Sequence, residues 1–277
     1  MENNAIHHLL SEIQNQELSL TKQETLKFAL SCIDLTSLEG SDTAEKITRL
    51  CQKAISIPTA AVCVYPVFAK QAGTLLSGTP IKTAVVAGAF PAGQMPIELK
   101  LQEVAYAIEQ GAQEIDMVIS RGKFLEGRYD EVASEIAAIK NMCGTHALLK
   151  VILETGELQD IQLIYKASEL AMDAGADFIK TSTGKIPVNA TPESFATMCI
   201  AIKNFHQKTG KQIGIKPAGG ISDAEAASFF VKILENILGI EWMTPRLFRI
   251  GASRLADVLS NELSGNESIK DLQKTNY

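Results

Sequence analysis

The sequence predicts a single (β/α)₈ barrel, and three observations support this prediction. The chain has 277 residues, enough for a fold that needs roughly 250. Eight short apolar, β-branched runs occur between Phe28 and Leu263, and segments with helical spacing separate them. No change in composition divides this alternation, which indicates parallel strands around one core. A doubly wound open sheet is the alternative that this pattern leaves open.

The eight expected strands are continuously apolar in their centres, as parallel strands buried on both faces are. They cover residues 28–36, 60–66, 81–88, 114–120, 147–155, 177–183, 212–219 and 248–253. Capping residues mark the helices between them. Thr43 precedes a helical pattern over 44–55, and Pro96 opens a helix that Gly111 ends. Further helices are expected over 157–173, after Thr191 and from Ser222.

The two ends of the chain fall outside the alternating pattern. Residues 1–27 have the spacing of one amphipathic helix, which we expect to pack across the bottom of the barrel. Residues 264–277 are polar and are expected to form a flexible tail. The barrel itself is therefore expected to span residues 28–263.

Composition excludes several classes of protein. The net charge of −6 argues against a nucleic-acid-binding surface, which needs a concentrated basic face. The five cysteines are widely spaced and include no C-x-x-C pair, a usage typical of a reducing compartment. Neither a signal peptide nor an apolar stretch of membrane-spanning length is present. A cytoplasmic protein without membrane contact is expected; its oligomeric state stays open, and a homodimer is one outcome.

Lysines within two apolar strands are the main anomaly of the sequence. Catalytic groups of such barrels project from the C-terminal ends of the strands, where Lys180 and Lys216 occur. Burying an ammonium group is costly, and two of them at close range lower the pKa of at least one. A neutral amine can attack a carbonyl and form a Schiff base. Structural ion pairs are the competing interpretation.

Other polar residues follow the same strand ends. Asp116 can counter a lysine charge and move protons, or it can form an internal salt bridge. Asp34 and Thr36 end the first expected strand. Cys63 lies in the second, where it is either a reactive thiol or a small buried core residue.

Three glycine-containing turns follow the last three strands, at residues 181–185, 219–222 and 251–254. Backbone N–H groups in such turns can bind an anion, and phosphate sites of these barrels usually follow strands seven and eight. Lys185 and Arg254 supply charge, and Ser253 supplies a hydroxyl. The four histidines show no zinc-ligand spacing, so no metal is expected.

Several motifs together resemble the deoxyribose-phosphate aldolase family over nearly the whole chain. They are CIDLT, EIDMVIS, LLKVILETGEL, AGADFIKTSTGK, NATPE, IKPAGGI and FRIGAS. The segment ADFIKTSTGK is the most specific, because a strand lysine, a polar turn and a second lysine occur together in it.

The resemblance implies a cofactor-independent carbon–carbon lyase that reversibly cleaves 2-deoxy-D-ribose 5-phosphate to acetaldehyde and D-glyceraldehyde 3-phosphate. It implies that Lys180 is the Schiff-base nucleophile, that Lys216 lowers its pKa, and that Asp116 relays protons. It further implies that Asp34, Thr36 and Cys63 line the sugar and aldehyde pocket. The residues implied to contact the phosphate end are Thr183, Gly184, Lys185, Gly219, Gly220, Gly251 and Ser253.

The chain departs from many relatives at Ser222, where they carry an arginine. This difference favours weaker phosphate binding or a relaxed preference for phosphorylated substrates. The chain ends in Tyr277, whose hydroxyl a flexible tail could bring into the site. Two alternatives remain open: a Schiff-base aldolase with another or a non-phosphorylated substrate, and a non-catalytic barrel that binds a phosphosugar.

Overall fold

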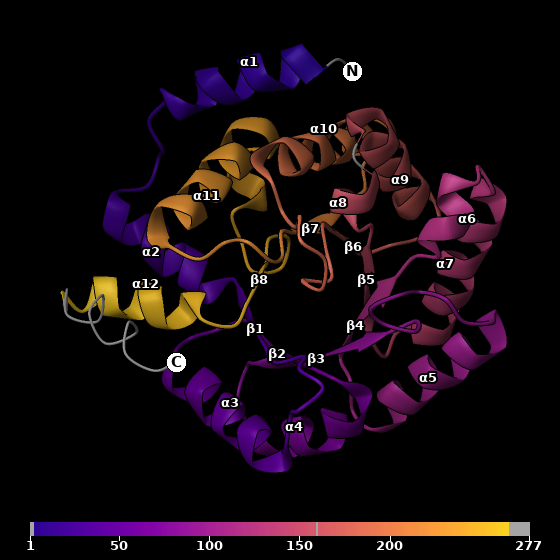
Figure 1. Cartoon of the computed structure of the whole chain (residues 1–277). Coiled ribbons are helices and arrows are strands. Elements are labelled where there is room, and N and C mark those ends of the chain that lie inside the picture. Colours follow the sequence, from indigo (N-terminus) through magenta and orange to yellow (C-terminus); the bar gives the residue numbers. More distant parts are fainter. Residues whose placement is uncertain (1–2, 159, 266–277) are drawn as a thin grey trace.

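Eight parallel strands form the centre of the molecule, and helices surround them (Figure 1). The computed structural model describes residues 3–158 and 160–265. The sheet order is β7-β6-β5-β4-β3-β2-β1-β8. The strands are β1 (Ile33–Thr36), β2 (Ala61–Val64), β3 (Lys82–Ala87), β4 (Glu114–Val118), β5 (Leu148–Ile152), β6 (Phe178–Lys180), β7 (Gly214–Lys216) and β8 (Ile250–Ala252).

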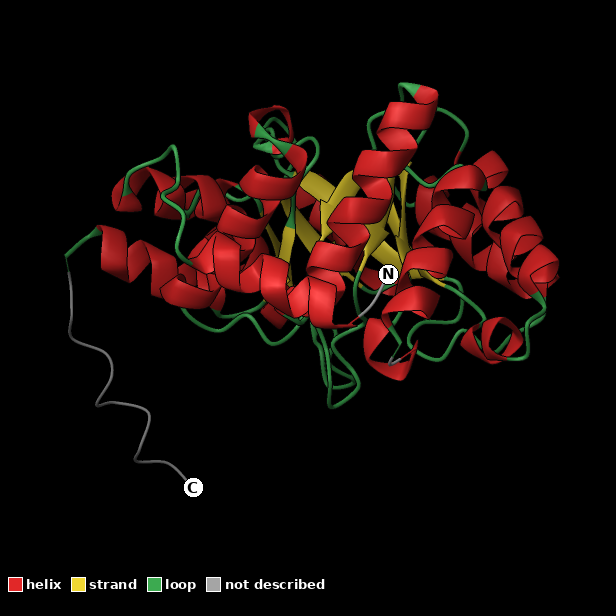
Figure 2. Ribbon diagram, turned by 90° about the horizontal axis from the view of Figure 1, so that it is seen from above, coloured by secondary structure: helices red, strands yellow, loops and turns green. Residues whose placement is uncertain are grey.

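The ring closes between the chain segments that contain β7 and β8. Ile215 pairs with Phe248, and Ala218 pairs with Gly251, both in parallel orientation. A doubly wound open sheet has two free edges, so this closure rules out that alternative and confirms the (β/α)₈ barrel. Figure 2 shows the strands enclosed by helices on both sides.

Helices connect the strands on the outside of the barrel. They are α3 (Ala44–Ser56), α4 (Ala69–Leu75), α5 (Ile97–Glu109), α6 (Arg121–Leu125), α7 (Tyr129–Cys143), α8 (Thr155–Leu158), α9 (Ile161–Asp173), α10 (Pro192–Thr209), α11 (Ala224–Leu238) and α12 (Leu255–Leu263), with 3₁₀ turns η1 (Pro66–Phe68) and η2 (Ile240–Trp242). Within the described ranges, no helix has both the length and the apolar character needed to cross a membrane.

The N-terminal region differs from its prediction in two ways. It forms two helices, α1 (Asn3–Gln14) and α2 (Lys22–Ser31), rather than one. Helix α1 buries Ile6, Leu10 and Ile13 against α10 and α11 on the outside of the ring, not across the bottom of the barrel (Figure 1). A single helix with one apolar face can cover the outer groove between two helices, and α1 does so here.

The first strand is also shorter than expected, because residues 28–31 belong to α2. Thr21 and Glu24 form a capping box: the Glu24 N–H donates to Thr21 Oγ1 (3.3 Å), and the Thr21 N–H donates to Glu24 Oε2 (2.9 Å). This box starts a helix whose buried face includes Leu26 and Leu30. The apolar run continues from helix into strand, so apolar content alone does not reveal the boundary.

The helix expected over 157–173 is divided as well. Helix α8 ends at Leu158, and Asp160 caps α9 by accepting a hydrogen bond from the Gln162 N–H (2.8 Å). Asp223 rather than Ser222 caps α11. A flexible tail was expected from residue 264. Most of it, residues 266–277 with Tyr277, lies outside the described residues.

Most of the apolar core lies between the strands and the surrounding helices. A second, small apolar group lies on the β1–β3 side of the barrel interior, and it consists of Leu38, Ala61, Cys63, Ala84 and Val86. Charged side chains occupy the rest of the interior; β1 and β4 to β7 contribute them, together with Arg249, which directly precedes β8. The barrel interior therefore contains a small apolar region beside a charged one.

Candidate active site

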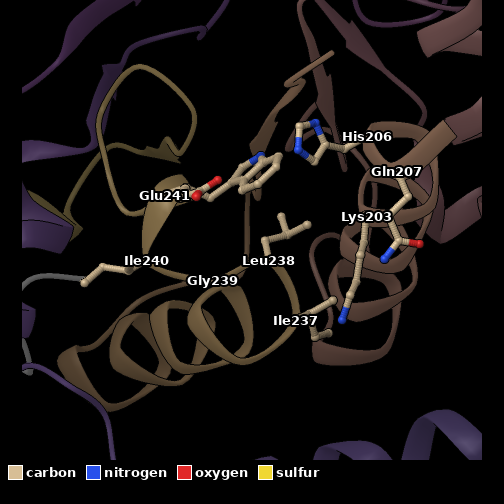
Figure 3. A pocket seen from close by; sticks show the side chains of 9 residues that line it. Lys203, His206, Gln207, Ile237, Leu238, Gly239, Ile240 and Glu241 are labelled. Carbon is tan, nitrogen blue, oxygen red and sulfur yellow. The ribbon is translucent and has the colours of Figure 1, made fainter. Parts of the chain in front are cut away.

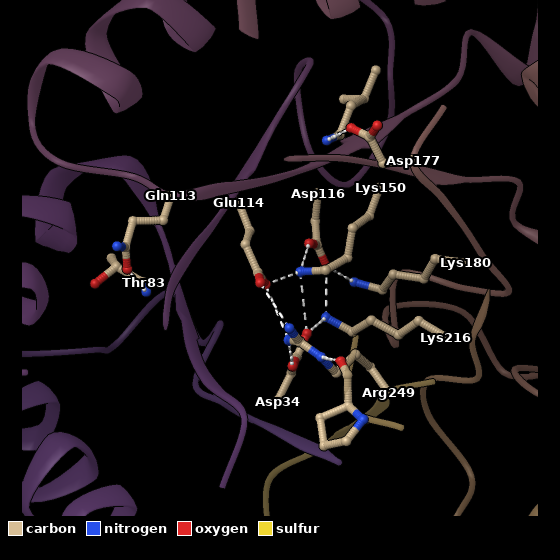
Figure 4. Close-up of polar contacts among 12 residues, drawn as sticks. Asp34, Thr83, Gln113, Glu114, Asp116, Lys150, Asp177, Lys180, Lys216 and Arg249 are labelled. Atoms are coloured by element: carbon tan, nitrogen blue, oxygen red, sulfur yellow. Dashed lines mark hydrogen bonds and ion pairs between the residues drawn. The ribbon is translucent and has the colours of Figure 1, made fainter. Parts of the chain in front are cut away.

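Seven buried charged side chains form one cluster inside the barrel (Figure 4). This charged cluster consists of Asp34, Glu114, Asp116, Lys150, Lys180, Lys216 and Arg249. Strand register brings its members together: Asp116 pairs with Lys150 across β4 and β5, and Lys180 pairs with Lys216 across β6 and β7. Parallel neighbours in register point to the same face, so these side chains all enter the interior.

Asp116 lies at the centre of the upper part of the cluster. Its Oδ2 atom accepts hydrogen bonds from Lys180 Nζ and from Lys216 Nζ, each at 2.7 Å. Its Oδ1 atom accepts one from Lys150 Nζ at 3.0 Å. The two lysines expected to meet therefore do so, with the expected carboxylate between them. One carboxylate oxygen shared by two amines is a short path for a proton.

Asp34, Glu114 and Arg249 complete the cluster below. Arg249 donates to Asp34 Oδ1 (2.6 Å) and to both carboxylate oxygens of Glu114 (2.8 and 3.1 Å). Lys150 reaches Glu114 (2.5 Å) and Asp34 (3.2 Å), and Lys216 also bonds Asp34 (2.5 Å). Fork-shaped pairing of this kind holds an arginine firmly in place. Asp34 therefore lies beneath the lysines as a structural partner of three cations.

The charges of the cluster do not balance if every group is ionised. Four side chains can be cationic and three can be anionic, so full ionisation leaves one buried positive charge in excess. A buried unpaired charge is costly, and the group that loses least by deprotonation gives up its proton. Arg249 keeps its charge in proteins, so the group that loses its proton most readily is expected among the three lysines.

The surroundings of Lys180 lower its pKa, whereas those of the other two lysines do not. Burial lowers the pKa of Lys180 below its usual 10.5; Asp116 opposes this shift, and the charge of Lys216 adds to it. Burial acts in the same direction on Lys216 and Lys150, but carboxylates outweigh it and raise the pKa of both. Among the described residues, Lys216 reaches two carboxylates and Lys150 reaches three, whereas Lys180 reaches Asp116 alone.

The two aspartates remain ionised. Although burial opposes it, the nearby charges of Lys150 and Lys216 hold the pKa of Asp34 far below its usual range. Lys150, Lys180 and Lys216 do the same for the pKa of Asp116. Asp116 is therefore available as a proton acceptor beside Lys180.

Thr36 and Cys63 lie side by side in register on β1 and β2. The Thr36 hydroxyl donates to the carbonyl of Asp34 (2.8 Å) and is partly exposed. Cys63 is fully buried, and this burial raises the pKa of its thiol. Its environment is that of a small core residue beside the charged cluster rather than of a reactive thiol.

The turns after β7 and β8 line a hollow of about 1510 Å³. Gly219 and Gly220 have φ angles of 75° and 81°, and a Cβ atom on Gly219 would lie 2.7 Å from the Asn189 side chain. Glycine is thus required there by both conformation and space. The lining of the hollow includes Gly219, Gly220, Ser222, Gly251, Ser253 and Arg254, so the structure brings the expected residues of these two turns together.

The turn after β6 is arranged differently. Lys185 Nζ contacts Glu39 Oε1 at 3.0 Å, on the loop after β1. Thr183 does not face the hollow: its N–H and its hydroxyl both donate to the buried Glu154 carboxylate (3.0 and 2.5 Å). From the sequence, Thr183 was expected to contact the substrate and Glu154 had no expected role, so this bonding was not predicted.

Glu114 and Arg249 were missed as well. Glu114 is two positions before Asp116 on the same strand face, and this spacing was the available signal. Arg249 directly precedes β8 and lies within the expected strand over 248–253, so its charge inside an apolar run was the available signal. Among residues 3–158 and 160–265, no group of three or more His, Cys, Asp or Glu side chains is arranged to hold a metal ion.

A smaller hollow of about 380 Å³ lies far from this cluster in the fold (Figure 3). Its lining includes Lys203, His206, Leu238 and Trp242, which belong to the ends of α10 and α11 and to η2. These segments directly precede β7 and β8. The hollow therefore belongs to the N-terminal end of the barrel, opposite the end where such barrels carry their active sites.

Comparison with known proteins agrees with this site. The family model described as DeoC/LacD family aldolase matches residues 28–235. The chain belongs to this family. As a DeoC/LacD aldolase, it is a carbon–carbon lyase.

Individual relatives of this DeoC/LacD aldolase cover most of its length. A deoxyribose-phosphate aldolase of Bos taurus is 47% identical over 83% of this chain and 78% of its own. One from Agrobacterium fabrum is 43% identical over 90% and 95%. The solved structure of the Aeropyrum pernix deoxyribose phosphate aldolase, described as tetrameric, superposes with a TM-score of 0.71 at 26% identity, over 95% of this chain and 99% of that one.

Proposed function

We propose that the chain reversibly cleaves 2-deoxy-D-ribose 5-phosphate to acetaldehyde and D-glyceraldehyde 3-phosphate through a Schiff base on Lys180. One observation carries the proposal: among the three lysines of the charged cluster, Lys180 alone has a lowered pKa. A neutral amine is the form that attacks a carbonyl carbon. The family and the names of the relatives supply the substrate.

The first half of the reaction joins Lys180 to the sugar. Its Nζ atom attacks the C1 aldehyde carbon of the open-chain sugar, and the carbonyl oxygen gains protons and leaves as water. The product is an iminium ion. Asp116 accepts hydrogen bonds from both Lys180 and Lys216, so it can take and return these protons directly or through one water molecule.

The second half breaks the carbon–carbon bond. The 3-hydroxyl gives up its proton, the C2–C3 bond breaks, and its electron pair moves into the iminium ion to form an enamine. D-Glyceraldehyde 3-phosphate leaves with C3, C4 and C5. Protonation of the enamine at C2 and addition of water to C1 then release acetaldehyde and restore the free amine. The positive charge on Lys216 favours the electron shift toward this end of the site.

The remaining assignments concern substrate binding. The apolar group around Cys63 is suited to the two-carbon aldehyde end, and Thr36 offers a hydroxyl beside it. The backbone of Gly219, Gly220 and Gly251 and the side chain of Ser253 line the hollow where a phosphate can bind. Arg254 lines the same hollow as Ser222 and provides a cation there.

Trapping the intermediate tests the proposal. The protein is incubated with deoxyribose 5-phosphate, reduced with borohydride, and mapped by mass spectrometry beside a Lys180→Ala variant. We expect a reduced adduct on the peptide that contains Lys180 and no adduct or cleavage activity in the variant. An adduct on Lys216 instead, or turnover by the variant, would contradict the assigned nucleophile.

Ser222 favours a second candidate, an aldolase of the same mechanism that acts on a non-phosphorylated substrate. Comparing kcat/KM for deoxyribose and its 5-phosphate separates the two. A non-catalytic barrel has no use for a lysine of lowered pKa beside a carboxylate that can accept its proton, and it would give no adduct. A homodimer, a cytoplasmic location and a role in deoxyribonucleoside breakdown stay predictions.

A further inference from the structure

The segment Glu154-Thr155-Gly156 follows β5 and belongs to a motif that the proposed reaction leaves unused. Glu154 is fully buried and has a φ of 57°, in the left-handed region that residues other than glycine seldom adopt. Such a conformation persists only where the surrounding structure determines it, and it is common near functional sites. The hydrogen bonds of Glu154 show which segments of the chain it holds in place.

Both carboxylate oxygens of Glu154 are bonded to the turn after β6. Oε1 accepts from the Thr183 N–H (3.0 Å), and Oε2 accepts from the Thr183 hydroxyl (2.5 Å). The Thr183 hydroxyl oxygen in turn accepts from the Lys185 N–H (3.1 Å). A continuous chain of hydrogen bonds therefore runs from Glu154 to the backbone of Lys185, and it leaves the Thr183 donors unavailable to a substrate.

Arg121 attaches Glu154 to two further loops. Its guanidinium donates to Glu154 Oε2 (2.8 Å), to Glu157 Oε2 (2.9 Å) and to the carbonyl of Ala92 (3.3 Å). Ala92 follows β3 and Arg121 follows β4, so this arginine joins the loops after β3, β4 and β5. Charge-assisted hydrogen bonds of this kind are short and define geometry.

The backbone of α8 also supports the turn after β6. A Cβ atom on Gly156 would lie 2.0 Å from the carbonyl oxygen of Val188. The loop after β6 therefore rests directly on the backbone of α8, and only glycine allows this approach. Side-chain bonds and backbone contact act on the same loop.

We propose that Glu154 and Arg121 are positioning residues that fix the turn of Gly184 and Lys185, which the family resemblance places at the phosphate end of the substrate. Lys180 lies in the same segment, but its side chain bonds Asp116 and its backbone pairs with β5 and β7, and none of these contacts involves the Glu154 carboxylate. Loss of the Glu154 bonds should therefore affect phosphate recognition and leave the nucleophile in place. This inference rests on the proposed function.

The test compares Glu154→Gln with Glu157→Gln. Both carboxylates bond Arg121, but only Glu154 bonds Thr183, so Glu157→Gln is the matched control. For each protein, kcat and KM are measured with deoxyribose 5-phosphate and with deoxyribose, and the borohydride-trapped acetaldehyde adduct is quantified. Glutamine keeps the shape of glutamate but replaces one acceptor oxygen by a donor.

For Glu154→Gln we expect the KM for the phosphorylated sugar to rise on the order of tenfold, the loss expected for a hydrogen bond to a charged group. We expect kcat, the KM for deoxyribose and the adduct yield to stay within about twofold, a change that corresponds to less than 1 kcal/mol. Glu157→Gln should behave as the wild type. Equal KM changes for both sugars, or loss of adduct, would overturn the proposal.

Thr183→Val and Thr183→Ser keep the inference testable if Glu154→Gln does not fold. Valine removes the hydroxyl that bonds Glu154 and Lys185, and serine retains it. Only the valine variant should raise the KM for the phosphorylated sugar, and equal values in the two variants would overturn the proposal. If the wild type gives neither cleavage nor adduct, the proposed function itself fails, and this inference fails with it.

Discussion

Three lysines of the same barrel interior differ because each reaches a different number of carboxylates. Within the part of the chain that the structure describes, Lys150 contacts three, Lys216 contacts two, and Lys180 contacts only Asp116, which it shares with the other two. Desolvation acts on all three, so the number of nearby negative charges decides which amine has the lowered pKa. This division of roles suits a reaction that needs a nucleophile and a permanent cation side by side.

The lowered pKa of Lys180 predicts how adduct formation depends on pH. The rate should rise with pH as Lys180 loses its proton, because only the neutral amine reacts. The midpoint of this rise should lie below 10.5, and the rate should level off above it. The measurement is the rate of trapped acetaldehyde adduct formation between roughly pH 5 and 10, in a range where most proteins remain folded. A rate still rising tenfold per pH unit at the upper end would contradict the lowered pKa.

At the scale of elements, the packing of β6 against β7 depends on a glycine. A Cβ atom on Gly214 would lie 2.3 Å from the ring of Phe178, which is its partner in register. Phe178 is buried, and the Arg249 guanidinium carbon lies 5.9 Å from the centroid of its ring. The ring of Phe178 therefore fills the interior below Lys180 and Lys216. It occupies the space that a side chain larger than that of Gly214 would need.

Gly214→Ala should destabilise the barrel by about 1–3 kcal/mol, the usual cost of overpacking a rigid core. Chemical denaturation followed by circular dichroism measures the change in the free energy of unfolding. Gly40→Ala is the matched control, because nothing lies within 4 Å of an added Cβ atom there. Phe178→Leu should restore part of the loss when combined with Gly214→Ala; strictly additive effects would show that the two side chains do not meet.

On the scale of the whole molecule, the charged cluster joins six of the eight strand segments around the barrel. The pKa values of Asp34 and Asp116 are lower in the folded protein than in the unfolded chain. Both carboxylates therefore stabilise the fold above the unfolded pKa of about 3.9, and this contribution is lost as the pH falls below it.

The protein should consequently unfold readily in acid. Below about pH 3 these two groups alone give the free energy of unfolding a slope of about 2.7 kcal/mol per pH unit, since each takes up one proton on unfolding. Denaturation midpoints from pH 7 down to about pH 2, below the unfolded pKa of these groups, measure this slope. A free energy of unfolding that is constant across the range would contradict the depressed pKa values.

The sequence was sufficient for much of the fold and for the centre of the site. Apolar runs buried on both faces, separated by capped helices, determine a parallel barrel whatever the details of packing. Lys180, Lys216 and Asp116 were identifiable because charged residues inside such strands stand out. Glu114 was recognisable in principle by its two-residue spacing from Asp116.

Only the tertiary structure decided the rest, because those features depend on contacts between distant segments. The division of the N-terminal region followed from packing on α10 and α11, and the role of Thr183 followed from a carboxylate 29 residues away. Arg249 lies 215 residues from Asp34 along the chain but bonds it directly. Local pattern determines which residues form strands and helices, whereas charge pairing is determined by the three-dimensional register that brings these elements together.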